Sequence, residues 1–154
     1  MANPVFSSVT GRFVRYCDLA LGTDQLVIVL LKAAGLQADA TLRNYTALST
    51  LLGSNTEATF TNYARKVVTS GITVTTDTTN HKNTVALAGW TWTAAGGASN
   101  DALGKLLVCW RPTSGTADSG CIPLFAHDLT VTTTGSDLIV SIAGPNNIAT
   151  ATAA

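Results

Sequence analysis

Alternation of apolar and hydroxyl-bearing residues is the feature that most limits what this chain can fold into. Residues 72–76 (ITVTT), 129–132 (LTVT) and 138–142 (LIVSI) alternate with a period of two, which places every second side chain on one face of a β-strand. Threonine and valine are β-branched and fit a pleated, half-buried surface. The pattern predicts a mainly β fold, an antiparallel β-sandwich or barrel.

Two apolar runs predict the central strands of that fold. Residues 26–31 (LVIVLL) and 103–110 (LGKLLVCW) are apolar on both faces, as expected of strands covered on each side. Residues 134–137 (TGSD) predict a hairpin turn between the strands at 129–132 and 138–142.

One segment has helical spacing instead. Between residues 40 and 52, leucines and Tyr45 recur at intervals of three and four, which is typical of an amphipathic helix. Asp39 is a suitable N-cap and Gly53 a suitable residue after the last turn. We expect one short helix here, crossing between two strands.

The chain has no linker, repeat or shift in composition, so we expect one domain over residues 1–154 with an arm at each end. The arms are residues 2–8 and 144–154. The C-terminal arm is too small and polar to form a core of its own, and ends of this kind are disordered unless they are tied down. We expect them to contact neighbouring molecules. The arm residues expected at that interface are Pro4, Val5, Phe6, Pro145, Asn146 and Ile148.

Trp90 and Trp92 lie two residues apart, so they point to the same face of a strand. Such a pair serves as a core anchor or an oligomer contact, because tryptophan is enriched at both. We include both tryptophans among the expected interface residues. A face for stacking on sugars is the alternative.

Only 12% of the residues are charged and the formal net charge is zero, whereas soluble domains average about 25% charged residues. Nucleic acids and anionic membranes attract clustered lysine and arginine, so neither is an expected partner. Near-zero charge also removes the repulsion that keeps small proteins apart. The run at 26–31 is shorter than the roughly 20 residues of a membrane span, and Met1–Pro4 lacks the basic start of a secretory signal.

The three cysteines are Cys17, Cys109 and Cys121. Their number is odd and their spacings are long, which disfavours both a zinc site and a disulfide framework. We expect buried, reduced thiols, and a single Cys109–Cys121 bridge remains open.

Few groups are available for chemistry. His127–Asp128 lies near Cys121, but apolar neighbours raise the pKa of a thiol rather than activate it, so the pair is expected to be a polar start to a strand. Asp77 and Asn80 flank a turn without the carboxylates of a calcium loop, because the chain has one glutamate, Glu57. We therefore expect no catalytic residue, no metal and no cofactor.

Several segments together resemble a family of small virion proteins of tailed bacteriophages. The similarity runs over roughly residues 40–140. The segments that show it are 57–66 (EATFTNYARK), 71–74 (GITV), 77–80 (DTTN), 92–97 (WTAAGG), 103–109 (LGKLLVC) and 122–124 (IPL). Members are described as head decoration, minor tail or virion structural proteins. The resemblance implies a place in the particle and supplies no catalytic residues.

The expectation is therefore a capsid decoration protein, made in the host cytoplasm and found in the virion. It would bind the outer face of the major capsid protein lattice as a homotrimer and stabilise the head. The alternatives are a minor tail or tail-tip protein and a carbohydrate-binding head fibre or adhesin that uses Trp90 and Trp92. An enzyme is not expected.

Overall fold

A computed structural model describes residues 6–9, 13–77, 82–143 and 148–153 of the chain. In chain order its elements are the 3₁₀ turn η1 (Ser7–Val9), α1 (Phe13–Cys17), β1 (Gln25–Lys32), α2 (Asp39–Leu42), α3 (Leu48–Leu52), β2 (Lys66–Val68), β3 (Ile72–Asp77), β4 (Lys82–Leu87), β5 (Trp90–Trp92), β6 (Ala102–Arg111), the 3₁₀ turn η2 (Asp118–Gly120), β7 (Ile122–Thr132), β8 (Leu138–Ala143) and β9 (Ile148–Ala153).

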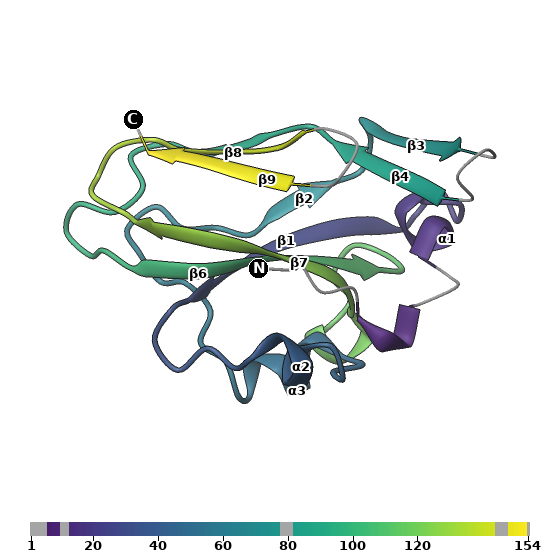
Figure 1. Ribbon diagram of the computed structural model, residues 1–154, viewed down its shortest axis with the longest axis horizontal. Coiled ribbons are helices and arrows are strands. Elements are labelled where there is room, and N and C mark those ends of the chain that lie inside the picture. The colour runs from purple at the N-terminus through teal and green to yellow at the C-terminus, as the bar shows by residue number, and fades with distance from the viewer. Residues whose placement is uncertain (1–5, 10–12, 78–81, 144–147, 154) are drawn as a thin grey trace.

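β1 and β6 are the inner strands of a four-stranded antiparallel sheet with the order β2-β1-β6-β7. Val29 of β1 faces Leu107 of β6 in the register. Residues 26–31 of β1 are all buried, because α2 and α3 lie on one side of this sheet and β8 and β9 on the other (Figure 1). The two apolar runs are thus the central strands that the sequence predicts.

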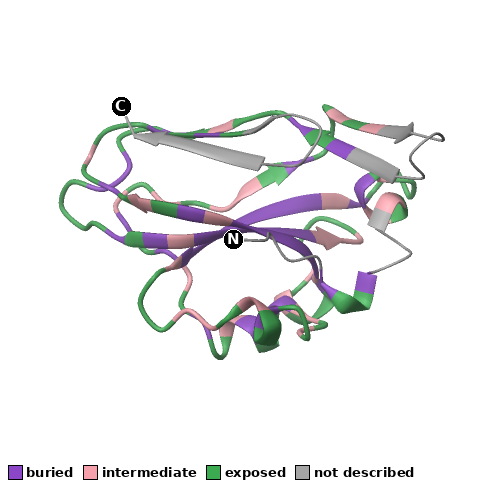
Figure 2. Ribbon diagram, in the orientation of Figure 1, coloured by how far each residue is buried: buried purple, intermediate pink, exposed green. Residues whose placement is uncertain are grey.

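The second layer consists of the β3–β4 pair and a three-stranded sheet with the order β5-β8-β9, all antiparallel. β4 also contacts β8, so the two pieces lie side by side above the four-stranded sheet (Figure 1). Val85, Leu138 and Val140 from this layer belong to the same apolar core as Leu106 and Val108 of β6. Figure 2 shows the buried stretches of the four-stranded sheet in purple. The fold is mainly β with short helices, as predicted.

The predicted helix over residues 40–52 is instead two short helices, α2 and α3. Ala47, just before α3, is extended, with φ −136° and ψ 145°, and the Leu48 N–H donates to the Cys121 carbonyl at 2.9 Å. This bond holds the start of α3 against the distant loop at Cys121, and the extended Ala47 separates α3 from α2. Asp39 is the first residue of α2 rather than its cap, and its carboxylate pairs with Lys105.

The predicted hairpin between residues 129–132 and 138–142 is wrong. These segments lie in β7 and β8, which belong to different sheets. The residues between them bond to another loop: Gly135 N–H donates to the Ala95 carbonyl at 2.8 Å, and Ala95 N–H donates to the Ser136 carbonyl at 2.9 Å. Gly96 in that loop has φ +100°, and a Cβ there would lie 2.2 Å from Asn100 Oδ1.

Both ends of the described chain are tied to the domain. Phe6 is fully buried, and its N–H donates to the Leu124 carbonyl at 3.0 Å. β9 extends the second layer, with Ile148 opposite Ala143 of β8. Of the remaining arm residues expected at an interface, Pro4, Val5, Pro145 and Asn146 lie outside the described residues.

Candidate functional site

Three clusters of charged side chains are candidate sites, and in each the charged groups contact one another within the chain. In the first, Lys32 Nζ lies 2.8 Å from Asp101 Oδ1, and the Thr59 N–H donates to Asp101 Oδ2 at 2.6 Å. Burial opposes ionisation of Asp101, but these donors hold its pKa below the ordinary value. The carboxylate therefore ties the start of β6 to β1 and the loop before β2.

The second cluster joins Arg65 to two carboxylates. Its guanidinium donates to Glu57 Oε2 at 2.7 Å and to Asp118 Oδ1 at 2.6 Å. Hydrogen bonds that Arg65 donates to both carboxylates raise the arginine pKa, with Glu57 the larger contributor. Tyr63 Oη also donates to Glu57 Oε1 at 2.8 Å. Both carboxylates are therefore held by hydrogen bonds within the chain.

The third cluster surrounds a buried lysine. Lys105 is 3% exposed, and its Nζ lies 2.8 Å from Asp39 Oδ1 and in close contact with Asp128 Oδ1. Burial disfavours its charge, yet the two carboxylates raise its pKa. The three side chains border an open cleft of about 530 Å³ beside Leu36 and Gly104. The lysine is fixed between α2 and β7 as a structural cation.

The cysteines are free and buried. Burial raises the pKa of the Cys17 thiol to about 12 and also raises those of Cys109 and Cys121. A thiol becomes a nucleophile only as the thiolate. The structure thus agrees with the expectation of inert, reduced thiols.

His127 lies in the middle of β7 rather than at a strand start. It is 2% exposed, it packs edge-on to Phe125 with ring centroids 5.1 Å apart, and neither ring nitrogen has a hydrogen-bond partner among the described residues. Burial lowers its pKa to about 4. The imidazole is therefore neutral and serves as part of the core.

The two tryptophans of β5 both pack against the core, on one face as predicted. Trp92 is 1% exposed, and its Nε1 donates to the Ala64 carbonyl at 2.8 Å. Trp90 is only partly buried. Trp92 therefore makes its contacts within this chain and has no free face for a sugar ring. The same holds for the contacts of Phe6, which is fully buried.

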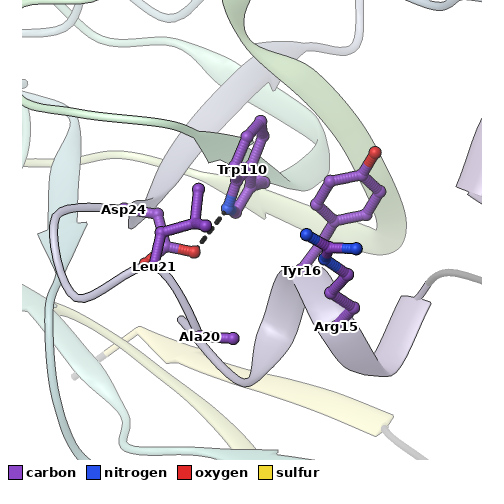
Figure 3. Close-up of a pocket in the computed structure, with 6 residues that line it drawn as sticks. All are labelled: Arg15, Tyr16, Ala20, Leu21, Asp24 and Trp110. Carbon is purple, nitrogen blue, oxygen red and sulfur yellow. Dashed lines mark hydrogen bonds between the residues drawn. The ribbon is translucent and has the colours of Figure 1, made fainter.

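A pocket of about 240 Å³, which the sequence did not predict, contains a buried carboxylate with an unsatisfied oxygen (Figure 3). Its lining residues are Arg15, Tyr16, Ala20, Leu21, Asp24 and Trp110. Asp24 is 5% exposed; its Oδ2 accepts a hydrogen bond from Trp110 Nε1 at 2.9 Å, whereas its Oδ1 has no partner among the described residues. Tyr16 packs against Trp110, with ring centroids 4.8 Å apart.

The topology explains how this pocket forms. Gln25 at the start of β1 pairs with Arg111 at the end of β6, so Asp24 and Trp110 meet although they are far apart in sequence. α1 then brings Tyr16 against the indole. The sequence features that could have indicated the pocket are Asp24, directly before β1, and Trp110, near the end of β6.

Among the described residues, no group of histidine, cysteine and acidic side chains is arranged to hold a metal ion. Within the same part of the chain, no helix is long and apolar enough to span a membrane. Comparison with known proteins finds no family model, no curated protein and no solved structure that matches this chain.

Proposed function

We propose that this chain is a structural protein of a bacteriophage particle, a decoration protein that binds the outer face of the major capsid lattice and stabilises the head. The phage assignment comes from the sequence resemblance described above. The surface of the molecule supports an assembly role.

The observation that supports an assembly role is that the chain uses its charges internally. Among the charged side chains whose burial the structure describes, those that are exposed are Arg15, Asp18, Arg43 and Asp137. Threonine, serine, alanine and glycine make up most of the remaining exposed positions. A surface of this kind has little electrostatic repulsion against copies of itself or a neutral lattice, so it suits close packing in many copies.

Avidity is the mechanism by which such a protein holds a shell. Linked copies raise the effective concentration of each weak contact, so a homotrimer clamps several capsid subunits although each contact is weak. Exposed apolar side chains supply candidate contact points on different elements: Leu21 is 53% exposed, Val67 on the edge strand β2 is 48% exposed, and Ile139 on β8 is 43% exposed.

Copy number in the purified virion tests this proposal. We expect a ratio to the major capsid protein near one to one, or one trimer per capsomer, by quantitative mass spectrometry. A few to a few dozen copies would favour the alternative of a minor tail protein. Absence from virions would exclude a virion role altogether.

A carbohydrate-binding fibre or adhesin is the remaining alternative, and its test is separate. Trp92 is enclosed by the core, so sugar stacking at β5 would depend on Trp90. We expect no glycan-array binding by the purified protein. Glycan binding that disappears in Trp90→Ala, with the circular dichroism spectrum unchanged, would replace the decoration proposal.

A further inference from the structure

We propose that the pocket between α1 and the adjoining ends of β1 and β6 is a receptor for a basic side chain, a lysine or arginine presented by another protein. This inference concerns the ligand chemistry of the pocket and stands independently of the virion proposal. It begins from Asp24, whose carboxylate is buried but only half satisfied.

A buried carboxylate requires donors for both of its oxygens. Asp24 is 5% exposed, yet the described residues give it one donor, Trp110 Nε1, and leave Oδ1 unpaired. Burying a charge without a counter-charge is far more costly than burying a neutral polar group. An ammonium or guanidinium group is therefore the ligand that gains most, because it brings the opposite charge to the carboxylate. Oδ1 is itself buried, so a hydrogen bond from the ligand to this oxygen requires the Asp24 side chain to turn toward the pocket.

The walls of the pocket suit the same kind of ligand. Tyr16 and Trp110 are both partly buried and present aromatic surface to the 240 Å³ space. Aromatic faces attract cations, with tryptophan the strongest, and they also cover the aliphatic stem of a lysine or arginine. The pocket thus combines the Asp24 carboxylate with the rings of Tyr16 and Trp110, and Arg15 lies on the same wall as Tyr16 (Figure 3).

The loop that borders the pocket contains a strained residue and an exposed apolar side chain. Leu19 has φ +51°, a left-handed conformation that is rare for leucine and costs on the order of 1–3 kcal/mol. Leu21, two residues on, is 53% exposed and so has little packing to hold it in place. Its apolar surface also favours a protein as the source of the cation, since a partner would cover it.

A different protein is the better source than a second copy of this chain. Among the described basic side chains, Lys32, Arg65 and Lys105 form ion pairs. Arg111 donates to Gln25, and Lys66 lies 5.3 Å from the centre of the Trp92 ring. Of the basic side chains whose burial the structure describes, Arg43 is the exposed one outside the pocket, so this described set offers a second copy little to insert.

The experiment titrates N-acetyl-arginine amide and N-acetyl-lysine amide into the ¹⁵N-labelled full chain and follows the indole N–H of Trp110 by NMR. The chain has three tryptophans, and the peak lost in Trp110→Phe assigns the reporter. We expect a saturable shift with a Kd on the order of 1 mM. The uncharged citrulline analogue has nearly the same shape and is expected to give no saturable shift.

Two variants separate charge at the pocket from charge in general. Asp24→Asn keeps an acceptor for Trp110 Nε1 and is expected to weaken binding by about tenfold or more. Asp18→Asn makes the same change in net charge at an exposed site six residues away and should leave binding unchanged. Arg15→Gln removes a like charge from the pocket wall and should strengthen binding a few-fold.

Several outcomes would overturn the proposal. These are no saturable shift with either basic analogue, an equal shift with the citrulline analogue, or full binding by Asp24→Asn. Loss of binding in Arg15→Gln would also contradict it, because a positive charge on the pocket wall should oppose a cationic ligand rather than hold it. Sedimentation of the wild type and Asp24→Asn gives the source: self-association that Asp24→Asn abolishes would overturn the assignment to a different protein.

Discussion

Lys105 and Asp24 are both buried charged residues next to the central strands, but their surroundings differ. Lys105, on β6, is 3% exposed and is contacted by the carboxylates of Asp39 and Asp128. Asp24, just before β1, is 5% exposed; the described residues give it one neutral indole N–H and leave one oxygen without a hydrogen bond. Within the described part of the chain, the charge of Lys105 has its partners and that of Asp24 does not.

This difference separates a structural group from a candidate binding group. A buried charge with a complete set of partners stabilises one arrangement of the chain, and losing a partner is expensive. A buried charge with an incomplete set lowers stability and gains from any ligand that completes it. The comparison predicts that variants around Lys105 will be costly and that the matching change at Asp24 will not.

Removing both carboxylates around Lys105 gives the largest expected effect. In the double variant Asp39→Asn/Asp128→Asn the ammonium stays buried without a counter-charge, so we expect a loss of about 3–5 kcal/mol in the free energy of unfolding. Urea denaturation followed by tryptophan fluorescence measures it. Adding Lys105→Met should recover most of the loss, since an apolar replacement for a whole buried ion cluster is often neutral. A triple variant as unstable as the double would show that the ammonium is not the cause.

His127 extends the comparison to a buried group that remains uncharged and whose ring nitrogens have no hydrogen-bond partner among the described residues. Its pKa is lowered from 6.5 to about 4 by burial, so the unfolded chain binds the proton first as the pH falls. The contribution of neutral His127 to the free energy of unfolding is fully present above pH 6.5. It is lost progressively between about pH 6.5 and 4, by up to about 1.4 kcal/mol per pH unit.

The free energy of unfolding as a function of pH checks this, with slopes compared rather than absolute values. His127→Leu should flatten the slope between pH 6.5 and 4. His81→Gln, which changes the other histidine of the chain, is the reference and should keep the slope. Equal slopes for the wild type and His127→Leu would rule out His127 as the titrating group.

The core strands were predictable from sequence because their pattern is local. The apolar run at 26–31 and the largely apolar segment 103–110, which is interrupted by Lys105, indicate strands that are buried on both faces, and period-two alternation indicates a strand. The two predictions that were wrong, one continuous helix and one hairpin, concern segments whose structure depends on distant contacts. Leu48 N–H bonds to Cys121 and divides the expected helix, and Gly135 bonds to Ala95 in place of a hairpin partner.

The candidate pocket was not predictable for the same reason. Tyr16, Asp24 and Trp110 come from three separate segments, and only the antiparallel pairing of β1 with β6 brings the last two together. The sequence does show a tryptophan within an apolar run and an aspartate before another. Period-two patterns identify faces but not neighbours, so nothing in the sequence links the two residues.

Asp101→Asn is the intermediate case, because Asp101 is a buried aspartate that has its partners. It is 7% exposed and receives the Lys32 ammonium and the Thr59 N–H. Replacing the carboxylate with an amide removes the charge from both contacts, so we expect a loss of about 1.5–3 kcal/mol. Chemical denaturation checks it, and Asp137→Asn at an exposed position is the control. A loss no larger than that of the control would mean that the Lys32 contact adds no net stability.

Asp24→Asn gives the smallest expected effect. The amide oxygen keeps the hydrogen bond from Trp110 Nε1, and the substitution relieves a buried charge that has no described counter-charge, so the two consequences oppose each other. We expect the free energy of unfolding to change by less than about 1 kcal/mol, with Asp18→Asn as the matched change at an exposed site. A loss as large as that of Asp101→Asn would mean that the folded chain already satisfies the Asp24 carboxylate. Asp24 would then be a structural group like Lys105, and the distinction between the two sites would fail.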